Sequence, residues 1–285
     1  MNKLPLKKSS VIILLKKIKK INLGREKISL DVSLGRFLDE NLISKIQLPP
    51  FKNSAVDGFA LHKSDIFNKK NNLEIIQRIA AGDLNSDKLK KGQAARIFTG
   101  AKMPINSNTV VMQENTIFSK DKVKINKMPN YGENCRYAGE DISIGQKIIS
   151  KGNLINSTNI NLIAAIGKKD VYVKKKLSIG FYTSGNELMK PTENLKDSQI
   201  NNSNYYSLKS LLKRSYIKSK YLGILKDSES IIKKSLLKNI NNHNVIITTG
   251  GASVGEEDHL VNIVKKIEKI YFWKTAIKPG RPLAI

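Results

Sequence analysis

From Leu177 onward, stretches with the pattern of buried strands alternate with stretches of helical period. The helix-like stretches begin at Ser203, Glu229 and Asp258, and the strand-like runs around them read LSIGFY, KYLGILK, NVIITT and FWKTAIK. Strands that alternate with helices in this way build a parallel sheet with helices on both of its faces. The alternation constrains the fold more than any other feature, and it predicts a doubly wound α/β domain.

Three loops follow strands of this predicted sheet, with the sequences TSGNEL, LKDSES and TTGGASVGEED. Ligands of open parallel sheets bind beyond the carboxyl ends of the strands, so we expect these loops to form a binding site. Asp227 or Ser228 is expected to cap the helix that follows the second loop.

The sequence before Leu177 has two regions with different patterns. Residues 10–50 have a helical pattern: VIILL at Val11–Leu15, flanked by lysines, predicts an amphipathic helix, and SLDVSLGRFLDENLIS at Ser29–Ser44 predicts another. Residues 51–137 change to short β-like runs, broken by Gly, Pro and Asn, which predict a compact β-rich module inserted into the first region. The predicted fold class is therefore α/β plus β-rich, in several domains.

The charge of the chain limits its partners. The formal net charge is +26, but only seven of the 50 basic residues are arginine, and aromatic residues make up 6%. Nucleic-acid binders concentrate arginine and stacking aromatics on one surface, whereas the lysines here occur in every segment. We expect weak attraction to polyanions and no specific nucleic-acid binding. No apolar run approaches the about 20 residues of a membrane span, so no membrane partner is expected.

Cys135 is the only cysteine, which excludes an intramolecular disulfide and indicates no zinc cluster. A reducing cytoplasm is the simplest setting for such a chain. The three histidines do not accompany a G-x-S-x-G pattern, so nothing supports a serine hydrolase.

The loop GGASVG at residues 250–255 offers backbone N–H groups with little obstruction from side chains, which suits phosphate oxygens. A tight strand–helix connection would explain the same glycines. Asp258 and its two glutamate neighbours either complement the helix dipole or bind a divalent cation. Other short acidic motifs support the cation, since Mg²⁺ takes carboxylate and phosphate oxygens together. These acidic residues are Asp57, Asp141, Glu187 and Asp227.

A basic group follows in FWKTAIKPGRP, where Lys274 and Lys278 share one face of the predicted strand and Arg281 comes after a Pro–Gly pair. Cations grouped in this way stabilise charge on a transferring phosphoryl or adenylyl group. A solvated basic edge is the alternative in a chain so rich in lysine.

Six motifs together resemble one family. LPPFKNSAVDGFAL, GQAARIFTGAKMPINSNTVVMQEN, NCRYAGEDISIGQ, YTSGNEL, VIITTGGASVGEEDHL and FWKTAIKPGRP are similar, in order and spacing, to the MoeA-type molybdopterin molybdenumtransferases and the gephyrin E domain. The resemblance covers nearly the whole chain. It implies a linker domain at 1–50 and 138–175, a β-rich inserted domain at 51–137, and a molybdopterin-binding α/β domain at 176–285.

The resemblance also implies a reaction, in which molybdate is inserted into adenylylated molybdopterin and AMP is released with the help of Mg²⁺. It implies a homodimer whose cleft lies between the α/β domain of one subunit and the β-rich domain of the other, and molybdopterin adenylyltransferase as a partner. The implied catalytic residues are Asp57, Thr99, Asp141, Glu187, Asp227 and Asp258, with Glu187 and Asp258 at the metal. The implied phosphate-binding residues are Gly250, Gly251, Ser253 and Gly255, and the implied molybdate-binding residues are Lys274, Lys278 and Arg281.

Some positions depart from the family pattern. Asn186 replaces an acid in the turn usually written GDEL, and we expect it to weaken one contact; Val56 and Arg281 are conservative changes. The sequence stops before the family's further G-N-P motif and its small C-terminal β-domain, so we expect a C-terminally truncated chain.

Two other functions compete with the enzyme. One is a noncatalytic, gephyrin-like scaffold that keeps the fold in order to bind molybdopterin or proteins. Retention of nearly every charged motif residue favours the enzyme, because a scaffold has no need for an array of like charges. The other is a nonspecific polyanion binder, which a steep salt dependence of nucleic-acid binding would support.

Overall fold

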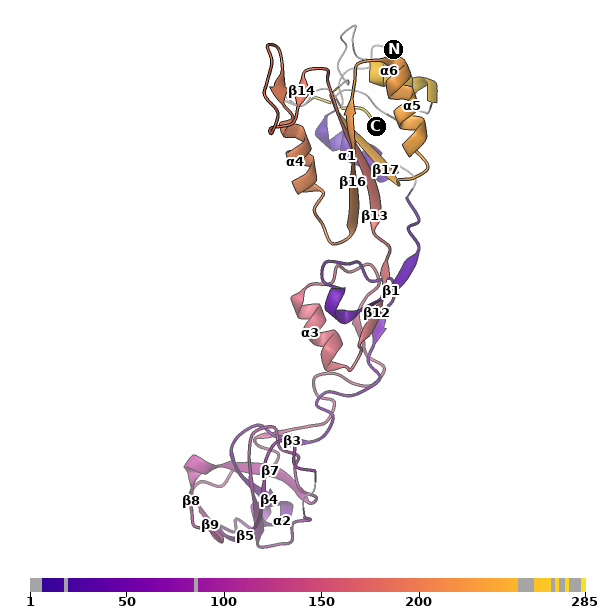
Figure 1. The fold of residues 1–285 in the computed structure, drawn as a ribbon. Coiled ribbons are helices and arrows are strands. Elements are labelled where there is room, and N and C mark those ends of the chain that lie inside the picture. Colours follow the sequence, from indigo (N-terminus) through magenta and orange to yellow (C-terminus); the bar gives the residue numbers. More distant parts are fainter. Residues whose placement is uncertain are drawn as a thin grey trace. The chain divides into compact units, whose positions relative to one another are not determined.

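The computed structural model of the protein contains the parallel sheet that the sequence predicts (Figure 1). The structure describes residues 7–17, 20–84, 87–250, 259–267, 270–271, 275–276 and 283–285. The chain forms two compact units. The first consists of Met1–Glu40, Gly152–Ile160 and Asp170–Ile285, and the second of Asn41–Lys151 and Asn161–Lys169. The finer three-part division expected from the sequence stays a prediction.

Three parallel strands form the largest sheet among the described residues of the first unit. β13 (Leu177–Ser184) lies in the middle, between β16 (Ile217–Leu225) and β17 (Val245–Thr249). Phe181 is the register partner of both Tyr221 and Ile247. The three strand-like runs predicted from LSIGFY, KYLGILK and NVIITT are confirmed. The run FWKTAIK lies largely outside the described residues.

Helices cover both faces of this sheet (Figure 1). α4 (Ser203–Leu211) packs on the face of Phe181, whereas α5 (Glu229–Asn239) and α6 (His259–Ile267) pack on the face of Tyr182. Successive side chains of a strand point to opposite faces, so the apolar run of β13 supplies both cores. The doubly wound arrangement is therefore confirmed.

The order of the strands creates a switch point. The chain passes from β13 through α4 to β16 on one side, and then through α5 to β17 on the other side of β13. The crossover that leaves β13 and the crossover that leaves β16 run in opposite directions across the sheet. In sheets of this kind ligands bind in a crevice at such a switch point, which is expected here at the carboxyl ends of β13 and β17. The loops TSGNEL and TTGGASVGEED begin at this crevice.

The N-terminal helix is confirmed as α1 (Lys8–Lys17), in which Val11 is buried. The helix predicted over Ser29–Ser44 is wrong. There the chain leaves β1 (Arg25–Ser29), makes a single 3₁₀ turn, η1 (Leu30–Val32), and continues as a loop.

The error has a physical cause. Leu38 and Leu42 are buried because they meet residues distant in the sequence: Leu38 bridges to Val173, and Leu42 pairs with Ile149. Val32 and Leu34 are more than half exposed, so the apolar residues of this stretch do not form one helical face. Tertiary pairing here overrides the local period.

The second unit is built around a six-stranded sheet in the order β7-β4-β6-β5-β9-β8, antiparallel except for the parallel pair β5–β6. Its strands are β4 (Gly58–His62), β5 (Asn72–Ile79), β6 (Gln93–Ile97), β7 (Ser107–Met112), β8 (Thr116–Phe118) and β9 (Lys122–Ile125). Phe59 and Leu61 belong to one core cluster and Ala60 to another, so β4 is buried on both faces. The predicted β-rich pattern is confirmed, whereas the bounds 51–137 stay a prediction; the second unit is called the β-rich unit below.

Short elements complete the description. They are β2 (Leu42–Ile43), β3 (Asn53–Ser54), α2 (Lys63–Phe67), η2 (Gln113–Asn115), β10 (Cys135–Arg136), β11 (Lys147–Ile149), α3 (Ser157–Ala165), β12 (Asp170–Lys174), β14 (Leu188–Met189) and β15 (Ile200–Asn201). β12 pairs antiparallel with β1, and β14 pairs parallel with β15. None of the described helices has the length and hydropathy needed to cross a membrane.

We predict that Gly58→Ala destabilises the β-rich unit, because a methyl group on β4 would overlap the carbonyl oxygen of Val111 on β7. The expected loss is about 2 kcal/mol or more in the free energy of unfolding, measured by urea titration. Gly24→Ala is the control: Gly24 has open space around it and a φ of +66°, so its substitution should cost only about 1 kcal/mol. Equal losses in the two variants would contradict the close packing of β4 on β7.

Candidate functional site

The carboxyl ends of β13 and β16 are joined by a reciprocal pair of hydrogen bonds. The backbone N–H of Asn186 donates to Oδ2 of Asp227 at 3.2 Å, and the backbone N–H of Asp227 donates to Oδ1 of Asn186 at 3.3 Å. The N–H of Gly185 also donates to the carbonyl oxygen of Leu225. These bonds hold Asp227 in place at the end of its strand.

Glu187 lies one residue further along the same loop, and its side chain is exposed. Its carboxylate lies against Gly185, where a Cβ atom would overlap it. The acid therefore turns back toward the end of β13. The structure thus brings two predicted acids, Glu187 and Asp227, to neighbouring strand ends.

Gly250 follows β17 directly and brings a third strand end to the same place. Its φ is +85°, and a Cβ there would lie 2.8 Å from the carbonyl oxygen of Ser184 and 3.3 Å from its Cβ. A glycine is required for both reasons, since other residues rarely adopt this backbone conformation and none has room for a side chain. The backbones of β13 and β17 thus meet closely at the switch point.

A cavity of about 600 Å³ runs along β17, from His243 and Asn244 before the strand to Thr249 and Gly250 at its carboxyl end. Apolar side chains of α5 and α6 form much of its wall, among them Leu236 and Leu260. The hydroxyl oxygen of Thr249 is buried without a hydrogen-bond partner in the described part of the chain. A buried polar atom without a partner is costly, which makes this strand end suited to a polar ligand.

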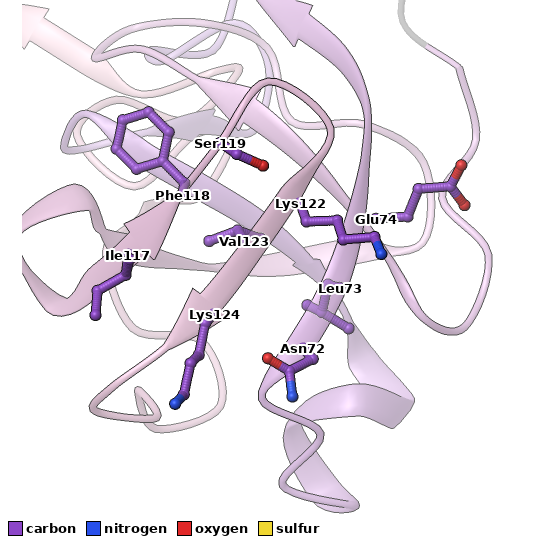
Figure 2. Close-up of a pocket in the computed structure, with 9 residues that line it drawn as sticks. All are labelled: Asn72, Leu73, Glu74, Ile117, Phe118, Ser119, Lys122, Val123 and Lys124. Atoms are coloured by element: carbon purple, nitrogen blue, oxygen red, sulfur yellow. The ribbon is translucent and has the colours of Figure 1, made fainter.

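Figure 2 shows a cavity of about 640 Å³ between β5 and the β8–β9 hairpin of the β-rich unit. Glu74 and Lys122 are register partners there, and the figure shows their side chains next to each other. None of the predicted site residues lines this cavity. Its size alone therefore does not make it the candidate site.

Seven predicted residues lie outside the described part of the chain, and their places in the site stay predictions. They are Gly251, Ser253, Gly255, Asp258, Lys274, Lys278 and Arg281.

The capping residue predicted for α5 is found in part. Ser228 occupies the N-cap position of α5, but its side chain makes no capping hydrogen bond.

In the β-rich unit, Asp57 and Thr99 form a pair, although they are 42 residues apart. Oδ1 of Asp57 accepts hydrogen bonds from the backbone N–H of Thr99 at 2.8 Å and from its hydroxyl at 2.7 Å. The bond from the backbone N–H, followed by the bond from the hydroxyl, lowers the pKa of the Asp57 carboxyl, and Arg96 adds a smaller effect. The pair holds a carboxylate in its ionised form.

Asp141 pairs with Arg136, whose Nη2 lies 2.5 Å from Oδ2 of the acid, while Nε of Arg136 binds Glu140 at 2.6 Å. The hydrogen bond to Asp141, followed by the one to Glu140, raises the pKa of Arg136. Arg136 was not among the residues predicted for the site. The sequence signal for Arg136 is its position: it lies five residues before Asp141 in NCRYAGED, and arginine is rare in this chain.

Family models match both parts of the chain. Residues 7–167 match the MoeA N-terminal region (domain I and II), and residues 180–285 match a probable molybdopterin binding domain. The chain belongs to the MoeA family. The resemblance carried by the six motifs and the predicted fold class are thereby confirmed.

Two relatives of this MoeA family member share one name, and a third is named for molybdopterin biosynthesis. The molybdopterin molybdenumtransferase of Haemophilus influenzae is 32% identical over 91% of this chain, and that of Staphylococcus epidermidis is 36% identical over 89%. The chain spans 64% and 62% of those two proteins. A putative molybdopterin biosynthesis protein of Methanocaldococcus jannaschii is 32% identical, over 99% of this chain and 72% of its own length.

The fold of this MoeA family member has a counterpart among solved structures. The molybdopterin biosynthesis MoeA protein of Pyrococcus horikoshii OT3 is similar with a TM-score of 0.85 and 30% identity. The similarity covers 99% of this chain and 72% of that protein.

We predict that Thr99→Val raises the pKa of Asp57 toward its ordinary value, though not fully, because the backbone N–H of Thr99 still donates. The carboxyl carbon of Asp57 would be followed by NMR during a pH titration, with Thr99→Ser as the control that keeps the hydroxyl. A lowered pKa stabilises the folded state above the ordinary pKa, and this stability is lost as the pH falls through the folded pKa. Thr99→Val should therefore reduce the acid-side pH dependence of stability, and an unchanged titration would contradict the assignment of the hydroxyl bond.

Proposed function

We propose that the chain is a molybdopterin molybdenumtransferase, which inserts molybdate into adenylylated molybdopterin and releases AMP. The matches to both MoeA family models support this function, as do relatives that carry the same name. The observation that carries the proposal is the convergence of three strand ends at the switch point, where Gly250 meets Ser184 and Asn186 bonds to Asp227.

Each proposed residue has a role that its chemistry supports. The backbone of Gly250 and the loop residues Gly251, Ser253 and Gly255 would bind the phosphates of the ligand, because N–H groups at a strand–helix turn attract anions. Lys274, Lys278 and Arg281 would hold molybdate. Glu187, Asp227 and Asp258 would lie on the opposite, acidic side of the ligand.

Magnesium is part of the proposal. Mg²⁺ is usually held by one or two carboxylates together with phosphate oxygens and water. The described residues contain no group of three or more His, Cys, Asp or Glu that could hold a metal by themselves. Glu187 and Asp258 would be the carboxylates that hold an ion shared with the phosphates of the ligand. When bound, the ion would neutralise charge on those phosphates.

We further propose a homodimer, in which Asp57 and Thr99 of the β-rich unit act on the ligand bound by the other subunit, and Asp141 lines the same cleft. Ile12, Ile13 and Leu15 of α1 are exposed, and exposed apolar side chains support an association of this kind. Molybdopterin adenylyltransferase is the proposed supplier of the substrate. The single cysteine is consistent with the proposed setting, the cytoplasm.

The test is direct. The purified chain would be mixed with adenylylated molybdopterin, molybdate and Mg²⁺, and AMP release would be measured by chromatography. We expect release that depends on molybdate and stops when the divalent cation is chelated. Binding of adenylylated molybdopterin without any release of AMP would overturn the transferase proposal and favour a noncatalytic binding protein.

We predict that Asp258→Ala lowers the rate of AMP release about a hundredfold or more, the scale expected for loss of an active-site charge. Asp227→Asn should also lower the rate, because it removes the charge while it keeps the shape of the side chain. Asp197→Asn is the matched control, since Asp197 is an exposed acid of the same unit. If the control loses as much activity as Asp227→Asn, the loss reflects net charge and the site assignment is wrong.

A further inference from the structure

One row of side chains crosses the sheet of the β-rich unit, and none of its members is among the residues proposed to contact the ligand of the reaction. Arg96 on β6 is the register partner of Phe59 on β4 and of Arg78 on β5. Register partners point to the same face of a sheet, so the two arginines stand directly beside each other. Like charges in this position repel and destabilise the sheet.

Aromatic rings surround both guanidinium groups. The Cζ atom of Arg96 lies 4.8 Å from the ring centroid of Phe59 and 4.7 Å from that of Phe118, and Cζ of Arg78 lies 4.4 Å from that of Phe98. The rings attract the guanidinium cations through cation–π interactions. They do not provide acceptors for the N–H groups, which point outward in the guanidinium plane.

The hydrogen bonds of Arg96 are incomplete. Nη2 donates to Oε1 of Gln113 at 2.5 Å, but Nη1 is buried without a partner. Within the described part of the chain, neither Arg96 nor Arg78 forms an ion pair with a carboxylate. Arg96 is partly buried, whereas Arg78 is exposed. A partly buried cation without an anion is costly, so Arg96 lacks acceptor oxygens that an anion could supply.

A cavity of about 350 Å³ lies over this row. Arg78, Arg96 and Lys120 line it as cations, Asp121 is its one lining acid, and Phe118 forms part of its wall. The volume lies at the lower end of the range for small-molecule sites, which begins at about 300 Å³. Three positive charges against one negative charge favour an anion with more than one charge.

We propose that this cavity binds the phosphate group of a small molecule. A phosphate dianion offers three oxygens, and planar guanidinium groups bind such oxygens through paired N–H donors. The anion separates the charges of Arg78 and Arg96 and supplies acceptors that the surrounding rings lack. The site is independent of the proposed transferase reaction, and its test measures binding alone.

The experiment is calorimetric titration of the full chain, with inorganic phosphate and with AMP as the probes. Because the proposed transferase site also binds phosphate and AMP, we expect saturable binding of which the part belonging to this cavity is the part that Arg78→Gln weakens. Tighter binding of AMP would identify a phosphate ester stacked on the aromatic wall as the ligand, and equal binding would identify free phosphate. No saturable binding of either probe would overturn the proposal.

Substitutions distinguish a specific binding site from the general attraction of anions to a basic protein. Arg78→Gln should weaken phosphate binding about tenfold or more, because it removes a charge-assisted bond to the anion. Lys91→Gln is the matched control: Lys91 is exposed on the same unit, outside the cavity, and its loss changes the net charge by the same amount. Equal effects of the two substitutions would overturn the proposal in favour of diffuse electrostatic binding.

Arg96→Lys provides a second variant, since it keeps the charge and loses the planar fork. We expect weaker phosphate binding with an unchanged secondary-structure spectrum. Unaltered affinity in this folded variant would also count against the proposal. A short oligonucleotide that binds where phosphate and AMP do not would instead identify nucleic acid as the ligand.

Discussion

The contact between the backbones of β13 and β17 is the constraint on which the candidate site depends. Gly250 turns away from β17 directly against Ser184, and a side chain at that position would push the two strand ends apart. The loop after β13 then bonds to the loop after β16 through Asn186 and Asp227. Three segments separated by whole helices thus reach one edge of the sheet, held there by backbone groups more than by side chains.

The β-rich unit follows a different principle. Its strand β4 is buried on both faces. The chain enters that strand from Asp57, which is bonded to Thr99 in the segment that follows β6. The same sheet carries the arginine row on one face. A sheet anchored by a strand that is buried on both faces can hold polar groups at its ends and on its surface, even where like charges oppose each other. The unit is therefore suited to present charged groups to a ligand.

Periodicity predicts those parts of the fold in which neighbours in sequence decide the structure. The alternation after Leu177 indicates the order of strands and helices, and the rule that ligands bind at carboxyl strand ends is enough to place Glu187 and Asp227 near each other. The same reasoning fails at Leu38 and Leu42, which are buried by partners more than a hundred residues away. Arg136 and Arg96 escape prediction for the same reason: their importance depends on cross-strand and loop contacts that leave no local pattern.

The paired hydrogen bonds from Thr99 have a consequence for what Asp57 is able to do. An aspartate is ionised at neutral pH even at its ordinary pKa, and the lowered pKa of Asp57 extends its ionised range to more acidic pH. Asp57 is then unable to deliver a proton to a leaving group at neutral pH, and as a weak base it gains little by taking one up. Its contribution to any chemistry is a permanent negative field, which repels an incoming oxyanion and favours a cation or a polarised N–H or O–H group at its free edge.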